Sequence, residues 1–168
     1  MMEFTLCQFD GDGHIKVALQ LAGSTLVARY EADTIEGVIW PAFTTLHRAD
    51  GLWQSTCFEI FLGQPDTPSY LELNLSPDGG WNCYKFDDVR TGMTTSDGFE
   101  VTYIETRGEL IEARVRWPGA TTSESWSLGL SAVIEMADSN LQYYALSHGD
   151  KPDFHDPSRH VLVRTNDL

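Results

Sequence analysis

Hydrophobic side chains recur at every second position through most of the chain. Residues 14–22 show this alternation, and residues 26–30 continue it after a turn at Gly23 and Ser24. A period of two places alternate side chains on opposite faces of a strand, so these residues predict a β-hairpin with one buried face. Further segments with this alternation are 56–63, 70–76, 81–86, 101–103, 111–117, 126–134, 141–148 and 160–165.

This pattern predicts an all-β fold. Helical periodicity is weak throughout, and only residues 42–50 suggest a turn or two of helix. Roughly ten short strands separated by turn sequences are typical of an antiparallel β-sandwich, of the jelly-roll or immunoglobulin-like kind. No internal repeat or linker divides the sequence, so residues 1–168 are predicted to form one ligand-binding domain.

Charge narrows the choice of partners. The chain has 25 Asp and Glu residues against 11 Lys and Arg residues, which gives a net charge of -14. So acidic a surface repels nucleic-acid phosphates and anionic lipid headgroups, so nucleic acid and membranes are not expected partners, whereas neutral or cationic ligands are. The first twenty residues lack the apolar run of a secretory signal, and the three cysteines are few and lack metal-type spacing. A cytoplasmic location is therefore predicted.

Familiar catalytic motifs are missing from the sequence. It contains no G-x-S-x-G elbow, phosphate-binding loop, dinucleotide fingerprint or H-E-x-x-H helix. This favours a non-catalytic role. If the protein were an enzyme, His155 and Glu59 would be the candidate acid–base pair.

Trp53 and Glu59 form the first candidate binding pair. Glu59 alternates with core-type Phe58 and Ile60, so it faces solvent or a groove. An indole stacks on the apolar face of a sugar ring, while a carboxylate accepts hydrogen bonds from its hydroxyls. The ordinary alternative is a tryptophan packed on its own loop and a solvated glutamate.

The hairpin that follows supplies a second polar group. Glu72 and Asn74 alternate with three leucines, so both are expected on the opposite face, with Trp81 nearby. Polar groups with aromatic neighbours suit a hydroxyl-rich ligand. The same pattern also fits the ordinary polar face of an antiparallel sheet.

The loop 148–157 is the third candidate region. As a binding loop, it would close one side of a groove with Lys151, Phe154 and His155. Alternatives are a zinc site that includes His148, or a haem held by Met93 and a histidine. The spacing matches no ligand motif and C-x-x-C-H is missing, so no cofactor is predicted. Haem is disfavoured, and the surplus of carboxylates leaves a calcium ion open.

Several segments together resemble a known family. The series 52–62, 70–77, Trp81 and 84–86, with 90–93 and 148–155, resembles the DOMON-like proteins, and more closely a bacterial branch related to the family 9 carbohydrate-binding modules. The resemblance spans residues 40–163. It implies a β-sandwich with a sugar- or haem-binding ancestry and does not imply an enzyme.

The resemblance also implies roles for individual residues. In the sugar-binding modules two tryptophans enclose a terminal sugar, and a glutamate six residues after the first binds its hydroxyls. Trp53 and Glu59 keep this spacing. The second tryptophan lies near the C-terminus in those modules, whereas here no tryptophan follows Trp126 and Phe154 is the nearest candidate.

The sequence thus predicts a non-catalytic module for a small carbohydrate or polyol. The predicted groove is lined by Trp53, Glu59, Asn74, Trp81, Lys151, Phe154 and His155. Two other classes remain as alternatives. One is a protein-interaction module that takes a peptide or a partner protein in the same groove, and the other is a metal- or haem-dependent protein.

Overall fold

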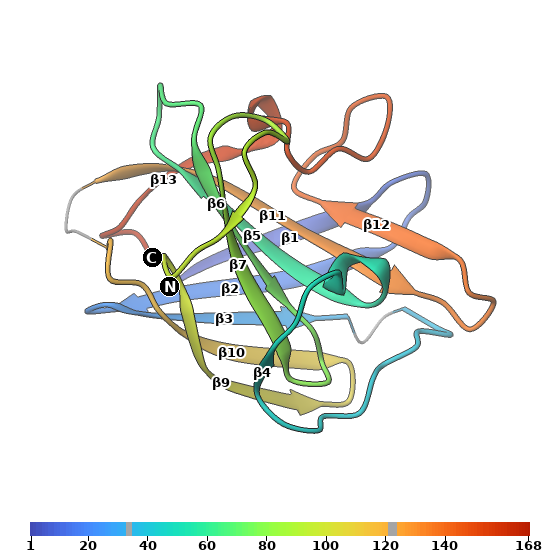
Figure 1. The fold of residues 1–168 in the computed structure, drawn as a ribbon. Helices are drawn as coiled ribbons and strands as arrows, with labels where there is room; N and C mark the ends of the chain where they lie inside the picture. The colour runs from blue at the N-terminus through green and yellow to red at the C-terminus, as the bar shows by residue number, and fades with distance from the viewer. Residues whose placement is uncertain (33–34, 121–123) are drawn as a thin grey trace.

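The computed structural model describes residues 1–32, 35–120 and 124–168 (Figure 1). Within these ranges the secondary structure is thirteen strands and two short 3-10 helices. They are β1 (Met2–Gln8), β2 (His14–Ala22), β3 (Thr25–Glu31), β4 (His47–Arg48), η1 (Leu52–Gln54), β5 (Cys57–Gly63), β6 (Tyr70–Leu75), β7 (Gly80–Phe86), β8 (Thr94–Thr95), β9 (Glu100–Arg107), β10 (Leu110–Arg116), β11 (Ser125–Glu135), β12 (Leu141–Ala145), η2 (Pro157–Arg159) and β13 (Val161–Arg164).

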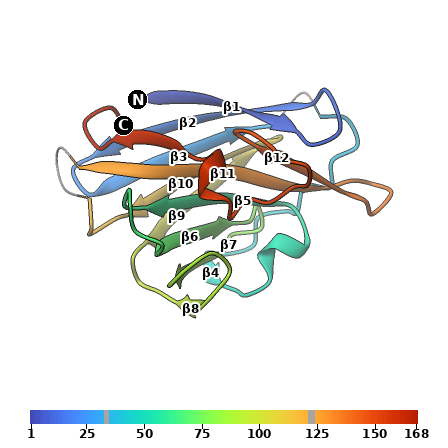
Figure 2. The same ribbon diagram turned by 90° about the horizontal axis from the view of Figure 1, so that it is seen from above.

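The strands form one sheet that curls into two layers. Their order is β4-β7-β6-β5-β11-β12-β1-β2-β3-β10-β9, with β13 beside β11 and β8 beside β7. Within the described residues every pairing is antiparallel except that of β4 with β7. Strands β5, β6 and β7 cross in front of β2, β3 and β10 in Figure 1, and Figure 2 separates β1–β3 from β5–β7.

The hydrophobic core lies between these layers. Tyr30 on β3 packs on Phe58 of β5 with their ring centroids 5.0 Å apart. Its hydroxyl donates a hydrogen bond of 2.9 Å to the carbonyl oxygen of Glu59. Leu73 and Leu75 of β6 are fully buried in the same core. The predicted all-β sandwich is therefore confirmed.

Two local predictions differ from the structure. Residues 42–50 form no helix, because backbone amides of this segment bond the turn that precedes β7: Thr44 N–H donates to Asp78 and His47 N–H to Gly79. These bonds hold the segment extended. The strand β1 was not predicted, because only Leu6 in it is fully buried and its apolar alternation is correspondingly weak.

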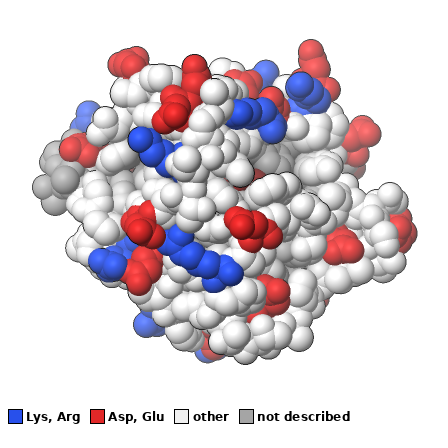
Figure 3. All heavy atoms as spheres, viewed as in Figure 1, with Lys and Arg blue, Asp and Glu red and all other residues white. Residues whose placement is uncertain are grey.

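Charged side chains are spread over the surface in both signs. Figure 3 shows acidic and basic residues interspersed on the face seen in Figure 1, with wide uncharged areas between them. Several belong to surface ion pairs, such as Arg29 with Glu112 and Arg48 with Asp97. Within the described ranges, no helix has the length and apolar character needed to cross a bilayer.

The hydrogen bond that joins the two layers is expected to be worth about 1 kcal/mol, because one net buried bond contributes about that much. Tyr30→Phe keeps the ring and removes only this bond. Urea unfolding should show a loss of this size. Tyr103→Phe is the matched control, because that hydroxyl bonds Glu105 at an exposed position. Equal stability of both variants would show that the bond across the layers contributes nothing.

Candidate functional site

A cavity of about 690 Å³ opens on the outer face of the layer that contains β5 and β6. Its floor comes from β5, β6, β11 and β12, and its sides come from η1 and the loops after β7 and β12. The lining residues are Trp53, Gln54, Glu59, Glu72, Phe86, Arg90, Met93, Val133, Leu141, Tyr143, Pro152, Phe154 and His155.

Strand alternation places two carboxyl groups on the floor. Phe58 and Ile60 point into the core, so Glu59 between them points to the cavity. Glu72 reaches the same face of β6 beside the core residue Leu73. Both are deeply set, since Glu59 is 3% exposed and Glu72 is 5% exposed.

Hydrogen bonds fix the two carboxyl groups in part. The register aligns Ser131, Glu59 and Asn74 across three strands. Ser131 Oγ donates to Glu59 Oε2 at 2.7 Å, and Asn74 Nδ2 donates to Glu72 Oε1 at 2.9 Å. Within the described part of the chain, no hydrogen bond reaches Glu59 Oε1, and the buried Asn74 Oδ1 has no partner. The floor therefore holds a surplus of acceptors.

Burial changes the protonation of this pair. Desolvation, reinforced by the charge of Glu72, raises the pKa of Glu59 to about 8 against a partial opposing effect of Ser131. Desolvation likewise raises the pKa of Glu72 to about 7, although its bond from Asn74 acts in the opposite direction. At neutral pH the pair therefore carries less than its full two negative charges.

A chain of polar groups forms one wall. The backbone N–H of Arg90 donates to Tyr70 Oη at 3.2 Å, and Tyr70 Oη lies 2.6 Å from His155 Nδ1. Since the hydroxyl oxygen accepts from Arg90, we assign its proton to the bond with Nδ1. The imidazole proton then sits on Nε2, which lies 3.7 Å from Glu72 Oε2. Burial lowers the pKa of His155 to about 4, so this imidazole is neutral at pH 7.

Aromatic rings flank the opening. Trp53 is 38% exposed and lies edge-on to Tyr84, whose hydroxyl donates to Asp50 at 2.7 Å. On the other side, Tyr143 and Phe154 have ring centroids 6.1 Å apart. The cavity thus offers apolar ring surface above a polar floor.

Four of the seven predicted site residues meet in this cavity. Trp53 comes from η1, Glu59 from β5, and Phe154 and His155 from the loop after β12. The expectation that loop 148–157 closes one side of a groove agrees with this arrangement.

The other three predicted residues lie elsewhere. Asn74 is fully buried and bonds Glu72 from beneath the floor. Trp81 pairs with core-facing Leu75, so it lies in the core at 7% exposure and not on the cavity. Lys151 is exposed and is not among the lining residues, because its loop turns inward only from Pro152.

Sequence reasoning missed several lining residues as members of the site. Val133 could have been found, because it alternates with the core residues Ala132 and Ile134 on the longest predicted strand. Tyr143 and the loop residue Arg90 carried no such signal. Arg90 donates from Nη2 to Asp153 Oδ1 at 2.9 Å, and this ion pair links two loops of the cavity wall.

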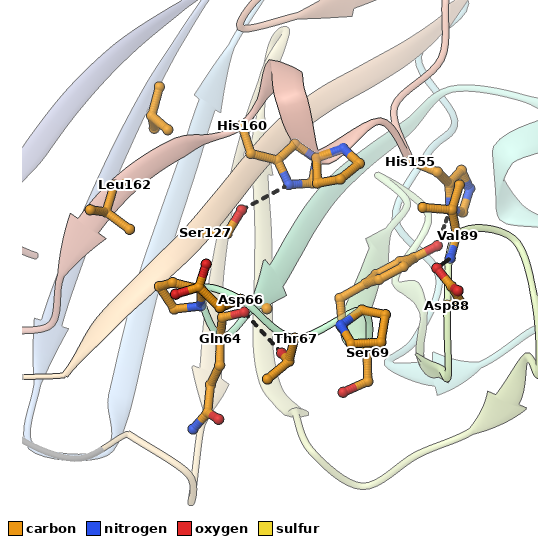
Figure 4. Close-up of a pocket in the computed structure, with 16 residues that line it drawn as sticks. Gln64, Asp66, Thr67, Ser69, Asp88, Val89, Ser127, His155, His160 and Leu162 are labelled. Atoms are coloured by element: carbon orange, nitrogen blue, oxygen red, sulfur yellow. Dashed lines mark hydrogen bonds between the residues drawn. The ribbon is translucent and has the colours of Figure 1, made fainter.

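A second cavity, of about 510 Å³, lies beyond His155 and shares that residue with the first (Figure 4). Asp88 and Val89 lie near His155, at the end opposite Leu162. The acidic side chains at this cavity, Asp66 and Asp88, are exposed. It therefore lacks the buried carboxyl groups that distinguish the first cavity.

The predicted zinc alternative finds no assembled ligand set. His148 Nε2 bonds the carbonyl oxygen of Cys7, and its ring packs on Phe9, apart from His155. Nowhere in the described ranges do three His, Cys, Asp or Glu side chains converge to hold a metal ion.

The molecule is thus a β-sandwich with a cavity that has aromatic walls and two carboxyl groups on its floor. No family model and no curated protein matches the sequence. Solved structures do match its fold. One is a protein from Bacteroides uniformis provisionally assigned as carbohydrate-binding, with a TM-score of 0.74, 10% identity and coverage of 98% of this chain and 86% of the other.

Two further matches come from Caldicellulosiruptor kristjanssonii. A family 9 carbohydrate-binding module in complex with cellotriose gives a TM-score of 0.55 at 12% identity, with 95% of this chain and 80% of the other covered. One in complex with glucose gives 0.50 at 12% identity, with 89% and 75% covered. The chain therefore has the fold of the family 9 modules, whereas its relation to DOMON-like proteins stays a prediction.

Proposed function

We propose that this protein is a non-catalytic carbohydrate-binding module that holds a small saccharide in the cavity above Glu59 and Glu72. The observation that carries this is the meeting of Trp53, Glu59, Phe154 and His155, predicted from separate segments, in one cavity. The shared fold with modules in complex with cellotriose and glucose supports it.

The geometry suits a sugar ring. The exposed indole of Trp53 offers a flat apolar surface for the ring's C–H face, and Phe154 is available in place of a second tryptophan. Hydroxyl groups would donate to the carboxyl groups of the floor. Gln54 and Arg90 at the rim supply donors for the ring oxygens.

Removal of the Trp53 ring should separate binding from folding. Trp53→Ala is expected to weaken saccharide binding at least about tenfold, since buried aromatic anchors dominate binding energy. Its free energy of unfolding should change by less than about 1 kcal/mol, because the ring is partly exposed. Isothermal titration calorimetry with glucose, cellobiose and cellotriose, together with urea unfolding, measures both.

The matched control is Trp81→Phe, which alters an indole of the core. It should lower stability and leave saccharide affinity unchanged. Parent affinity in Trp53→Ala, or no binding of these saccharides by the parent protein, would overturn the proposed function.

A further inference from the structure

The two carboxyl groups of the cavity floor are close neighbours. In the ladder of β5 with β6, Glu59 pairs with Asn74 and Phe61 pairs with Glu72, so the two glutamates are diagonal neighbours on one face. Both are more than nine-tenths buried. Two carboxylates in so dry a place lose hydration and repel each other, so they ionise fully only beside a cation.

The protein supplies little positive charge at this floor. Among the described lining residues, Arg90 is the one Lys or Arg, and its guanidinium, 57% exposed, is paired with Asp153. The wall contributes the neutral imidazole of His155. The floor strands β11 and β12 contribute uncharged side chains only: Ser131, Val133, Leu141 and Tyr143.

The hydrogen-bonding groups are equally one-sided. Glu59 Oε1 faces the cavity without a partner among the described residues, and Asn74 Oδ1 lies unpartnered beneath it. The one N–H that the wall points at the floor, His155 Nε2, is directed at Glu72. An ammonium group donates three hydrogen bonds and accepts none, so it complements such a floor better than a hydroxyl does.

The walls also favour a cation. Four aromatic side chains line the cavity: Trp53, Phe86, Tyr143 and Phe154. The negative faces of aromatic rings attract ammonium groups, most strongly where water is displaced. The net charge of -14 further concentrates cationic ligands near the protein.

We propose that the saccharide bound here is an amino sugar, whose protonated amine lies over Glu59 and Glu72. This inference rests on the proposed function and names the substrate class of the same cavity. The amine neutralises the buried carboxyl pair, while the sugar ring contacts Trp53.

A dependence on pH follows. An ammonium group beside the pair favours the ionised carboxylates, so binding of the amine releases protons that the free pair holds at pH 7. Affinity for an amino sugar should therefore rise between pH 6 and pH 7, in the range where the raised pKa values of Glu59 and Glu72 leave both groups partly protonated. Calorimetry in buffers of different ionisation enthalpy measures the released protons.

The test compares glucosamine, N-acetylglucosamine and glucose by calorimetry at pH 7. Glucosamine is expected to bind about tenfold or more tightly than glucose, since a buried charge pair outweighs a neutral hydrogen bond. N-acetylglucosamine keeps the nitrogen without its charge and should lack this advantage. Glu72→Gln should abolish the preference, whereas Glu109→Gln, which removes an exposed charge at the β9–β10 turn, should retain it.

The outcomes separate the two proposals. Equal affinity for glucosamine and glucose would overturn this inference and leave the proposed function standing. A preference that survives in both Glu72→Gln and Glu59→Gln would also overturn it, because the carboxyl pair would not be its cause. No binding of glucose, glucosamine or cellotriose would overturn both.

Discussion

Glu59→Gln should make the protein more stable than the parent at pH 8, by about 2–4 kcal/mol. Burial raises the pKa of Glu59 from 4.5 to about 8 in the folded protein. Each pKa unit corresponds to about 1.4 kcal/mol, and the charge of Glu72 and local relaxation reduce the full value. Glutamine has nearly the same shape, can accept the bond from Ser131 Oγ and has no charge to bury.

The sign of this effect fixes its pH range. A carboxyl group with a raised folded pKa binds its proton more tightly in the folded state. Stability is therefore full below pH 4.5 and falls as pH rises through the folded pKa values, about 7 for Glu72 and about 8 for Glu59. His155 acts in the opposite direction, because its lowered pKa of about 4 makes stability rise between pH 4 and its ordinary value of 6.5. The net loss should therefore be steepest between pH 6.5 and 8.

Urea unfolding of the parent and of Glu59→Gln at pH 5 to pH 9 tests this. The curves should lie close together at pH 5 and separate as pH rises. Glu109→Gln removes the same charge from an exposed turn and should follow the parent throughout. Parallel curves for the parent and Glu59→Gln would show that Glu59 ionises in the folded protein at its ordinary pKa.

The face on which each strand residue lies could be predicted from the sequence, because side chains alternate strictly along a strand. This is why Glu59 and Glu72 were expected on the face opposite the core. The same rule would have placed Trp81 correctly if the register had been known. The turn between β6 and β7 pairs it with Leu75, and a directly opposite partner shares its face.

Residues on loops could not be placed in this way. Loops lack a period, and their positions depend on contacts with distant segments. Arg90 sits in a turn with φ of 54°, and its ion pair with Asp153 crosses 63 positions of sequence. Lys151 and Phe154 lie three residues apart, yet only Phe154 lines the cavity. The sequence could predict that this loop belongs to the site, but not which of its side chains turn inward.

A second packed layer also escaped the alternation argument, because it lies outside the sandwich core. Phe61 points away from that core and is nevertheless 1% exposed. Its ring contacts His155 at a centroid distance of 5.1 Å and His160 at 5.9 Å. Gly129, its partner on β11, leaves room for this loop, since an added Cβ would lie 2.4 Å from His160 Nε2.

Phe61→Ala should therefore cost about 3–4 kcal/mol of unfolding free energy, although the residue faces outward, because deletion of a buried ring leaves an unfilled volume. The hole would lie under His155 and loosen its bond with Tyr70, so saccharide affinity should fall as well. Thermal unfolding and calorimetry measure the two losses. Tyr103→Ala, an exposed aromatic on β9, should lose less than about 1 kcal/mol and bind normally. If Phe61→Ala were as mild as this control, the loop would not be packed on the sheet, and the wall that positions His155 would have to form in another way.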